Sequence, residues 1–155
     1  MPTTRRATVD DADIIVHHRN RMFLDMGLPD DDHHRAAMAN FRPWIVRKLQ
    51  NCEYLGWFAT HDDRVIAGAG LLLIDFAPFA GDPGTVRGHL LNFYVEPEFR
   101  SQGLGRTLLE LAMAETRARR IRTVTLNASQ FGRPLYESFG FEQSTEMMFH
   151  NSLDA

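Results

Sequence analysis

Two glycines, Gly103 and Gly105, follow an apolar run that ends at Val95 and stand at the start of an amphipathic run that begins at Leu104. A helix that starts directly after such a loop presents unpaired backbone N–H groups, and the positive end of its dipole, at one point. Glycine lets a phosphate approach the main chain closely. The stretch therefore predicts an anion site with Arg100 and Arg106 at its edges, although two glycines in a loop could also serve only as a tight turn.

Two other phosphate-binding motifs fit this stretch less well. A dinucleotide-binding loop needs a third glycine where Leu108 stands, and a P-loop needs a Gly-Lys-Ser/Thr sequence that the chain lacks. The motif therefore disfavours an enzyme that acts on nucleotide phosphates.

The same segment resembles the GNAT superfamily of N-acetyltransferases, whose signature Arg/Gln-x-x-Gly-x-Gly/Ala is matched by Arg100, Gly103 and Gly105. The resemblance implies that acetyl-coenzyme A (acetyl-CoA) is the donor, with its pyrophosphate on the main chain of residues 102–107. It also implies that residues 93–95 pair with the pantetheine arm like an added strand. The cofactor-binding residues expected on this basis are Phe93, Tyr94, Val95, Arg100, Ser101, Gln102, Gly103, Leu104, Gly105, Arg106, Thr107, Asn127 and Tyr136.

Transfer of an acetyl group to an amine needs a neutral nucleophile, a polarised thioester and a proton for the departing thiolate. Tyr136 stands on a short expected helix, where similar enzymes place a tyrosine whose hydroxyl protonates the thiolate; a core tyrosine is the other interpretation. His89 falls where some relatives carry a catalytic glutamate, and histidine titrates near neutral pH, so His89 is the first candidate for the base. Glu96 is the second candidate for the base. Many relatives instead deprotonate the amine through a chain of waters. A histidine in a strand is often only structural, so that interpretation of His89 stays open.

Relatives shape their acceptor pocket with the first two helices and the loop between them. The substrate-binding candidates are Met22, Phe23, Met26 and Asn92. Methionines at helical spacing are usually core residues, and the acidic run at residues 30–32 usually caps a helix, so both structural interpretations stay open. The paired histidines at 17–18 and 33–34 lack spaced partners, and no metal is expected.

Hydrophobic patterning predicts an α/β (α+β) fold, with a mixed, mostly antiparallel central sheet flanked by helices. The strands are expected at residues 5–9, 54–60, 65–74, 88–95 and 124–127, with one or two more in 141–149. In the strand 88–95, alternation places His89, Leu91, Phe93 and Val95 on one face and Leu90, Asn92 and Tyr94 on the other. The first helix is expected from residue 10 or 11 to 26, and the second passes through Phe41 to Leu49 with a possible break at Pro43. Two further helices are expected from 104 to about 119 and at 134–138. The resemblance adds splayed central strands, which open beside Val95.

The 155 residues suit one domain, residues 1–155, with 44% hydrophobic and 24% charged residues. A net charge of -3 gives no general attraction to nucleic acid or membrane, and the lone Cys52 suits a reducing cytosol. These features suit a cytoplasmic protein. The resemblance implies an enzyme that transfers acetyl directly from acetyl-CoA to a small-molecule or peptide amine in a ternary complex, with a homodimer as a possible assembly. The alternative is a non-catalytic acyl-CoA-binding module, which would keep Arg100, Gly103 and Gly105 but would not need Tyr136.

Overall fold

The protein is built on a five-stranded sheet in the order β1-β2-β3-β4-β5. The structure is a computed structural model that describes residues 1–153. β1 (Thr3–Arg6), β2 (Tyr54–His61), β3 (Arg64–Asp75) and β4 (Val86–Val95) pair antiparallel, and β5 (Val124–Leu126) pairs parallel to β4. The predicted mixed, mostly antiparallel sheet is confirmed.

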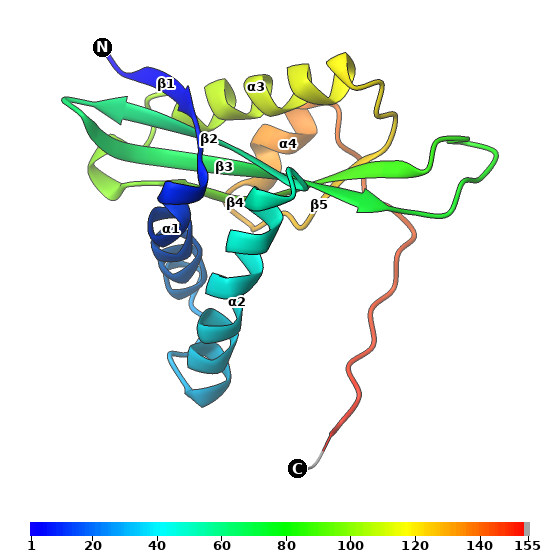
Figure 1. The fold of residues 1–155 in the computed structure, drawn as a ribbon, viewed down its shortest axis with the longest axis horizontal. Helices are drawn as coiled ribbons and strands as arrows, with labels where there is room; N and C mark the ends of the chain where they lie inside the picture. Colours follow the sequence, from blue (N-terminus) through cyan, green and yellow to red (C-terminus); the bar gives the residue numbers. More distant parts are fainter. Residues whose placement is uncertain (154–155) are drawn as a thin grey trace.

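Helices cover both faces of this sheet (Figure 1). On one side lie α1 (Ala12–Asp25), which follows the 3-10 turn η1 (Val9–Asp11), and α2 (Asp32–Gln50). On the other side lie α3 (Leu104–Ala118), which follows η2 (Pro97–Phe99), and α4 (Arg133–Phe139). Each side has its own apolar core, one between the sheet and α3 and one between the sheet and α1 and α2.

α2 runs without interruption through Pro43, so the possible break there does not occur. Proline removes one helical hydrogen bond. Phe41, Ile45 and Leu49 are buried on both sides of it, and this burial holds the helix together. At the other end the Asp31 carboxylate accepts the His34 N–H at 2.9 Å, which confirms the predicted capping role of the acidic run.

The first strand ends earlier than predicted, at Arg6 instead of Val9. The Thr8 N–H donates to Asp11 Oδ2 at 2.7 Å, and Arg5 donates to both carboxylate oxygens of Asp11 at 2.8 and 2.9 Å. This local network turns the chain into η1 and ends the strand.

The prediction of one or two strands in residues 141–149 is wrong. α4 ends at Gly140, whose φ of 113° is left-handed, and residues 141–153 then form no strand with any part of the chain that the structure describes. Phe141 packs against the core beside α3, but Met147, Met148 and Phe149 are exposed.

A bulge at Asn92 changes which residues of β4 share a face. Asn92 has a φ of 59°, and the register with β3 shifts between Gly68 and Gly70. Phe93 and Val95 therefore join Leu90 in the core beside α3, whereas Leu91 packs in the core beside α1 and α2. The predicted grouping of His89 and Leu91 with Phe93 and Val95 is wrong, because the extra residue at the bulge moves the side chains that follow it to the opposite face of the strand.

His18 on α1 lies in the core against the rings of Phe58 and Tyr94, with ring centroids 5.9 and 5.1 Å away. Gly68 leaves the room for it, since a Cβ there would lie 2.7 Å from His18 Nδ1. Burial, with a smaller effect of His17, lowers the pKa of His18 to about 4. His18 is therefore neutral at pH 7.

This burial predicts a pH-dependent stability. The folded pKa lies below the unfolded value of about 6.5, so the contribution of His18 is complete above pH 6.5 and is lost as the pH falls towards 4. The full loss is on the order of 2–3 kcal/mol. Urea unfolding at pH 7 and pH 4.5 should show the wild type losing more stability than His18→Gln, which cannot titrate; equal losses would contradict the assignment.

Candidate functional site

The site is organised around the place where β4 and β5 separate. Parallel pairing covers only the register from Gly88 with Val124 to Leu90 with Leu126. β3 stays paired with the opposite edge of β4 as far as Val95. Residues 91–95 therefore have one edge that pairs with no strand of the described chain, and this edge can accept an extended ligand through main-chain hydrogen bonds. The strands part after Leu90, earlier than the position beside Val95 that was expected.

The start of α3, residues 103–106, is the place where the sequence predicts an anion site, and it is called the anion cradle below. Gly103 is the N-cap, with a left-handed φ of 80°, and the first helical hydrogen bond runs from the Thr107 N–H to the Gly103 carbonyl at 3.1 Å. The N–H groups of Leu104, Gly105 and Arg106 precede that bond and have no helical acceptor. A Cβ on residue 103 would meet no atom within 4 Å, so the approach to these groups is open. Exposed main-chain donors at a helix start fit a pyrophosphate.

The two arginines beside the cradle are held by protein groups. Arg100 Nε donates to the Val95 carbonyl at 2.9 Å, and its Nη2 pairs with Asp25 of α1 at 2.9 Å. Arg106 Nη2 donates to Ser138 Oγ of α4 at 2.8 Å. Arg100 thus ties the end of β4 to α1. Ser101, with a φ of 62°, and Gln102 are exposed between the arginine and the cradle.

Tyr136 of α4 packs on the far side of the opening. Its ring stands perpendicular to that of Phe93, with centroids 5.9 Å apart, and contacts Phe141 at 6.0 Å. Burial raises the pKa of Tyr136 to about 12, so the hydroxyl is protonated at neutral pH. That hydroxyl makes no hydrogen bond with any residue in 1–153. Asn127 is exposed directly after β5, beyond the last paired residue.

His89 lies at the paired part of β4, with Nδ1 2.8 Å from Thr125 Oγ1 of β5. Its pKa is lowered, chiefly by burial and further by the charge of Arg19, while Glu146 acts in the opposite direction. The imidazole is therefore neutral at pH 7, as a general base must be. Tyr136 packs in the core beside α3, whereas His89 comes before the bulge and shares the face of Leu91, which packs beside α1 and α2. Glu96, the second candidate for the base, lies at the strand end, 3.8 Å from His17 Nε2.

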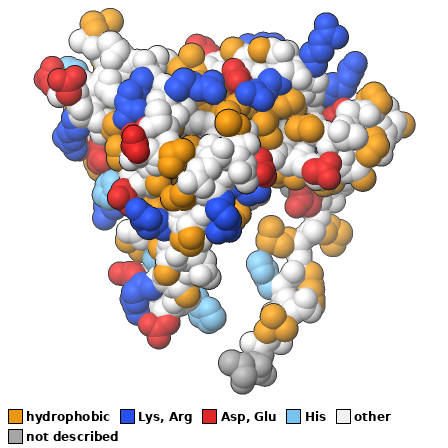
Figure 2. Space-filling model, viewed as in Figure 1, with side chains coloured by type: hydrophobic (Ala, Val, Ile, Leu, Met, Phe, Trp, Pro, Cys, Tyr) orange, Lys and Arg blue, Asp and Glu red, His pale blue; other side chains and the backbone are white. Residues whose placement is uncertain are grey.

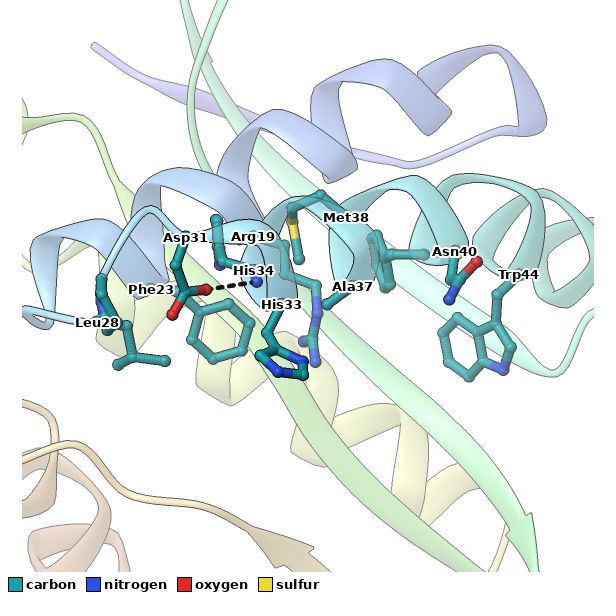
Figure 3. Close-up of a pocket in the computed structure, with 12 residues that line it drawn as sticks. Arg19, Phe23, Leu28, Asp31, His33, His34, Ala37, Met38, Asn40 and Trp44 are labelled. Atoms are coloured by element: carbon teal, nitrogen blue, oxygen red, sulfur yellow. Dashed lines mark hydrogen bonds between the residues drawn. The ribbon is translucent and has the colours of Figure 1, made fainter. Parts of the chain in front are cut away.

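A cavity of about 590 Å³ lies between α1 and α2 (Figure 3). Phe23 lines it, as predicted for the acceptor side, but Met22 and Met26 do not, and Met26 is exposed. Sequence reasoning missed Arg19, although Arg19 and Phe23 are four residues apart on one helix and so share a face. The complete lining consists of Arg19, Phe23, Leu28, Pro29, Asp31, His33, His34, Ala37, Met38, Asn40, Phe41 and Trp44.

Arg19 connects this cavity to the β4 bulge. Its Nη1 donates to Asn92 Oδ1 at 2.7 Å, and Asn92 Nδ2 donates to Tyr54 Oη at 3.1 Å. The guanidinium lies 4.7 and 4.8 Å from the ring centroids of Phe23 and Phe41. Asn92 therefore acts through Arg19 and does not line the cavity itself. The network fixes the bulge at Asn92, which lies within the free edge of residues 91–95.

Known proteins resemble this chain in sequence and in architecture. A family model described as an acetyltransferase (GNAT) domain matches residues 31–154. The ribosomal protein bS18-alanine N-acetyltransferase of Escherichia coli K12 is 41% identical over 121 residues, which cover 73% of this chain and 74% of that protein. The enzyme of the same name from Salmonella typhimurium is 34% identical over 111 residues, which cover 66% and 67%.

Two solved structures share the whole fold. A GCN5-related N-acetyltransferase from Ralstonia eutropha JMP134 has a TM-score of 0.93 and 33% identity, covering 98% of this chain and 99% of the other. A predicted acetyltransferase from Clostridium acetobutylicum, solved with acetyl-CoA, has a TM-score of 0.88 and 30% identity, covering 97% and 96%.

Residues 1–153 contain no cluster of three or more histidine, cysteine, aspartate or glutamate side chains placed to hold a metal ion. Within the same residues, no helix has the length and apolar character needed to cross a membrane.

Proposed function

The chain belongs to the GNAT family of N-acetyltransferases, and from this premise we propose that it moves the acetyl group of acetyl-CoA to the α-amine of a peptide. The opening between β4 and β5 carries the proposal, because it leaves the edge of residues 91–95 free next to Tyr136, which contacts Phe93, and begins directly after the paired segment that holds His89. The α-amine is favoured among acceptors because the curated relatives are named as alanine N-acetyltransferases of a ribosomal protein.

The donor is held mainly by the main chain. Within residues 102–107, the N–H groups of residues 104–106, which have no helical acceptor, bind the pyrophosphate at the open start of α3, and the free edge of residues 93–95 pairs with the pantetheine arm. Arg100 keeps that edge in place by binding the Val95 carbonyl. Its role is thus to position β4, and a direct contact with the phosphates is not required of it.

The transfer itself is direct. The neutral amine attacks the acetyl carbonyl, a nitrogen–carbon bond forms, and the carbon–sulfur bond breaks. Tyr136 gives its hydroxyl proton to the departing thiolate, and His89 takes a proton from the amine. A base on the α1 side and an acid on the α3 side suit acetyl transfer through the opening between the strands.

The base assignment predicts a change in the pH profile. Protonation of the peptide α-amine lowers kcat/KM below about pH 8. Because burial lowers the pKa of His89, the wild type should show a second acid limb below pH 6.5, as the imidazole becomes protonated. His89→Ala should lower kcat/KM by about 10²-fold and remove this acid limb. Thr125→Val, which removes only the hydrogen bond at 2.8 Å, should lower the rate and keep the limb. An unchanged limb in His89→Ala would exclude His89 as the base.

The acceptor class is tested with matched peptides. A peptide with a free N-terminal alanine should release coenzyme A and gain one acetyl group at its α-amine, located by mass spectrometry. The same peptide with a blocked N-terminus and a free lysine should release none above the rate without peptide. Acetylation of the lysine peptide alone, or of neither peptide, would contradict the α-amine proposal.

A further inference from the structure

Arg19 of α1 has no carboxylate beside it, unlike several other arginines on the two helices of that side. Arg21, Arg35 and Arg42 each pair with an aspartate at 2.6 to 3.2 Å. Figure 2 shows basic and acidic side chains together at the end of the molecule where α1 passes into α2. Within residues 1–153, no Asp or Glu side chain forms an ion pair with Arg19, which is partly buried. A partly buried cation without an anion is uncompensated, so an anion bound beside it would stabilise it.

The guanidinium is fixed by groups that use only one of its nitrogen atoms as a donor. The rings of Phe23 and Phe41 lie 4.7 and 4.8 Å from it, and its Nη1 donates to Asn92 Oδ1 at 2.7 Å. Arg87 Nε is the one buried side-chain polar atom without a hydrogen-bond partner in the described chain, so the free nitrogen atoms of Arg19 are open to solvent. A fixed, planar guanidinium with free N–H groups is suited to bind a carboxylate.

The free donors border the cavity of about 590 Å³ between α1 and α2. In Figure 3 the Arg19 side chain lies in the middle of the labelled lining, between Asp31 at one end and Trp44 at the other. Trp44 and Met38 add apolar surface. The Asp31 carboxylate is already engaged, because it accepts the His34 N–H at 2.9 Å and caps α2. A cavity of this size suits a small ligand or a few side chains of a peptide.

The same arginine joins the cavity to the strand at which acetyl transfer is proposed. Asn92, its hydrogen-bond partner, lies in the free edge of residues 91–95. His89, the proposed base, stands three residues earlier on β4. Three residues of strand span about 10 Å, a distance that the second and third residues of an extended peptide cover. A peptide whose α-amine reaches His89 can therefore place its next side chains at Arg19.

We propose that Arg19 determines acceptor specificity by binding the carboxylate of an acidic side chain at the second or third residue of the acceptor peptide. The proposal rests on the proposed function, because the bound peptide is the acceptor. The carboxylate accepts the N–H groups that Asn92 leaves free and supplies the anion that the protein itself does not place there. The enzyme thus prefers Asp or Glu next to the acetylated residue. A glutamine at the same place supplies no charge, and a lysine is repelled.

The preference is tested first with peptides that differ only at their second and third residues. With the wild-type enzyme, kcat/KM should be about tenfold or more higher for a peptide that begins Ala-Glu-Glu than for one that begins Ala-Gln-Gln. A peptide that begins Ala-Lys-Lys should be the poorest acceptor. Equal kcat/KM for the Glu and Gln peptides would overturn the proposal.

Substitution of Arg19 should remove the ratio between the two peptides. Arg19→Gln can still donate to Asn92 Oδ1 but has no charge, so the ratio should fall to about one. Arg19→Lys keeps the charge without the planar set of donors and should retain part of the ratio. The control Arg42→Gln removes an exposed arginine of α2 that binds Asp13 at 2.9 Å outside the cavity, and it should keep the wild-type ratio. A merely structural role of Arg19 would lower kcat/KM for both peptides alike, and a wild-type ratio in Arg19→Gln would overturn the proposal.

Binding without turnover separates this proposal from the proposed function. In calorimetric titrations of the protein with coenzyme A present, which carries no acetyl group, the Glu peptide should bind about tenfold or more tightly than the Gln peptide. This preference, with no acetylation of either peptide, would overturn α-amine transfer and support the role of Arg19. Acetylation of both peptides, with no preference in binding or in kcat/KM, would overturn the role of Arg19 and support α-amine transfer.

Discussion

Gly103→Val is expected to raise the KM for acetyl-CoA at least a hundredfold and to leave the protein folded. The N-cap position has a φ of 80°, which a β-branched residue adopts only at a cost of about 1–3 kcal/mol. The valine side chain would also extend into the open space over the N–H groups of Leu104, Gly105 and Arg106, where the pyrophosphate is to bind. The backbone strain and the obstruction of the N–H groups both raise the KM for acetyl-CoA.

A matched control separates the two effects. Gly27 has a φ of 89°, and a Cβ at that position would likewise meet nothing within 4 Å, but Gly27 follows α1 and is remote in sequence from the cradle. Gly27→Val should therefore carry a similar strain and leave the KM for acetyl-CoA unchanged. Circular dichroism checks folding of both variants. A Gly103→Val enzyme with wild-type KM for acetyl-CoA would show that the pyrophosphate does not bind at the start of α3.

Tyr136→Phe is expected to lower kcat about 10²-fold or more with little change in the KM for acetyl-CoA, because it removes the proton donor of the departing thiolate. The phenylalanine ring keeps the perpendicular contacts with Phe93 and Phe141. The hydroxyl has no hydrogen-bond partner within residues 1–153, so unfolding free energy should change by less than about 0.5 kcal/mol.

The split between the two kinetic constants identifies the role of the hydroxyl. A loss in kcat alone means that the hydroxyl acts in the transition state, whereas a rise in KM alone means that it only helps to bind the donor. Tyr136→Leu serves as the packing control, since it also removes the ring and should lower both stability and kcat. A Tyr136→Phe enzyme with wild-type kcat would exclude the proton-donor role.

Features with local signals were predictable from the sequence. The hairpin of β2 and β3, the start of α3 after Gly103 and the end of α4 at Gly140 all depend on neighbouring residues, and the structure has them where turn and capping chemistry indicated. The family resemblance could be found in the same way, because its signature lies in one short loop.

Features that depend on distant contacts were not predictable in this way. The bulge at Asn92 is held by Arg19 and Tyr54, from α1 and β2, and it reverses the faces assigned to Phe93 and Val95. The cavity between α1 and α2 forms only when the two helices lie side by side, so the sequence did not indicate that Arg19 and Trp44 both line it. Residues 141–149 were predicted to form one or two strands, but the sequence could not show that residues 1–153 offer them no strand to pair with.

Calorimetric titration of the wild-type protein with acetyl-CoA, and separately with ATP, tests the central claim most directly. One saturable site for acetyl-CoA, with ATP binding at least a hundredfold more weakly, is the result that a donor site at the start of α3 and the free edge of β4 predicts. Absence of acetyl-CoA binding to the folded protein, or equal binding of ATP, would contradict it.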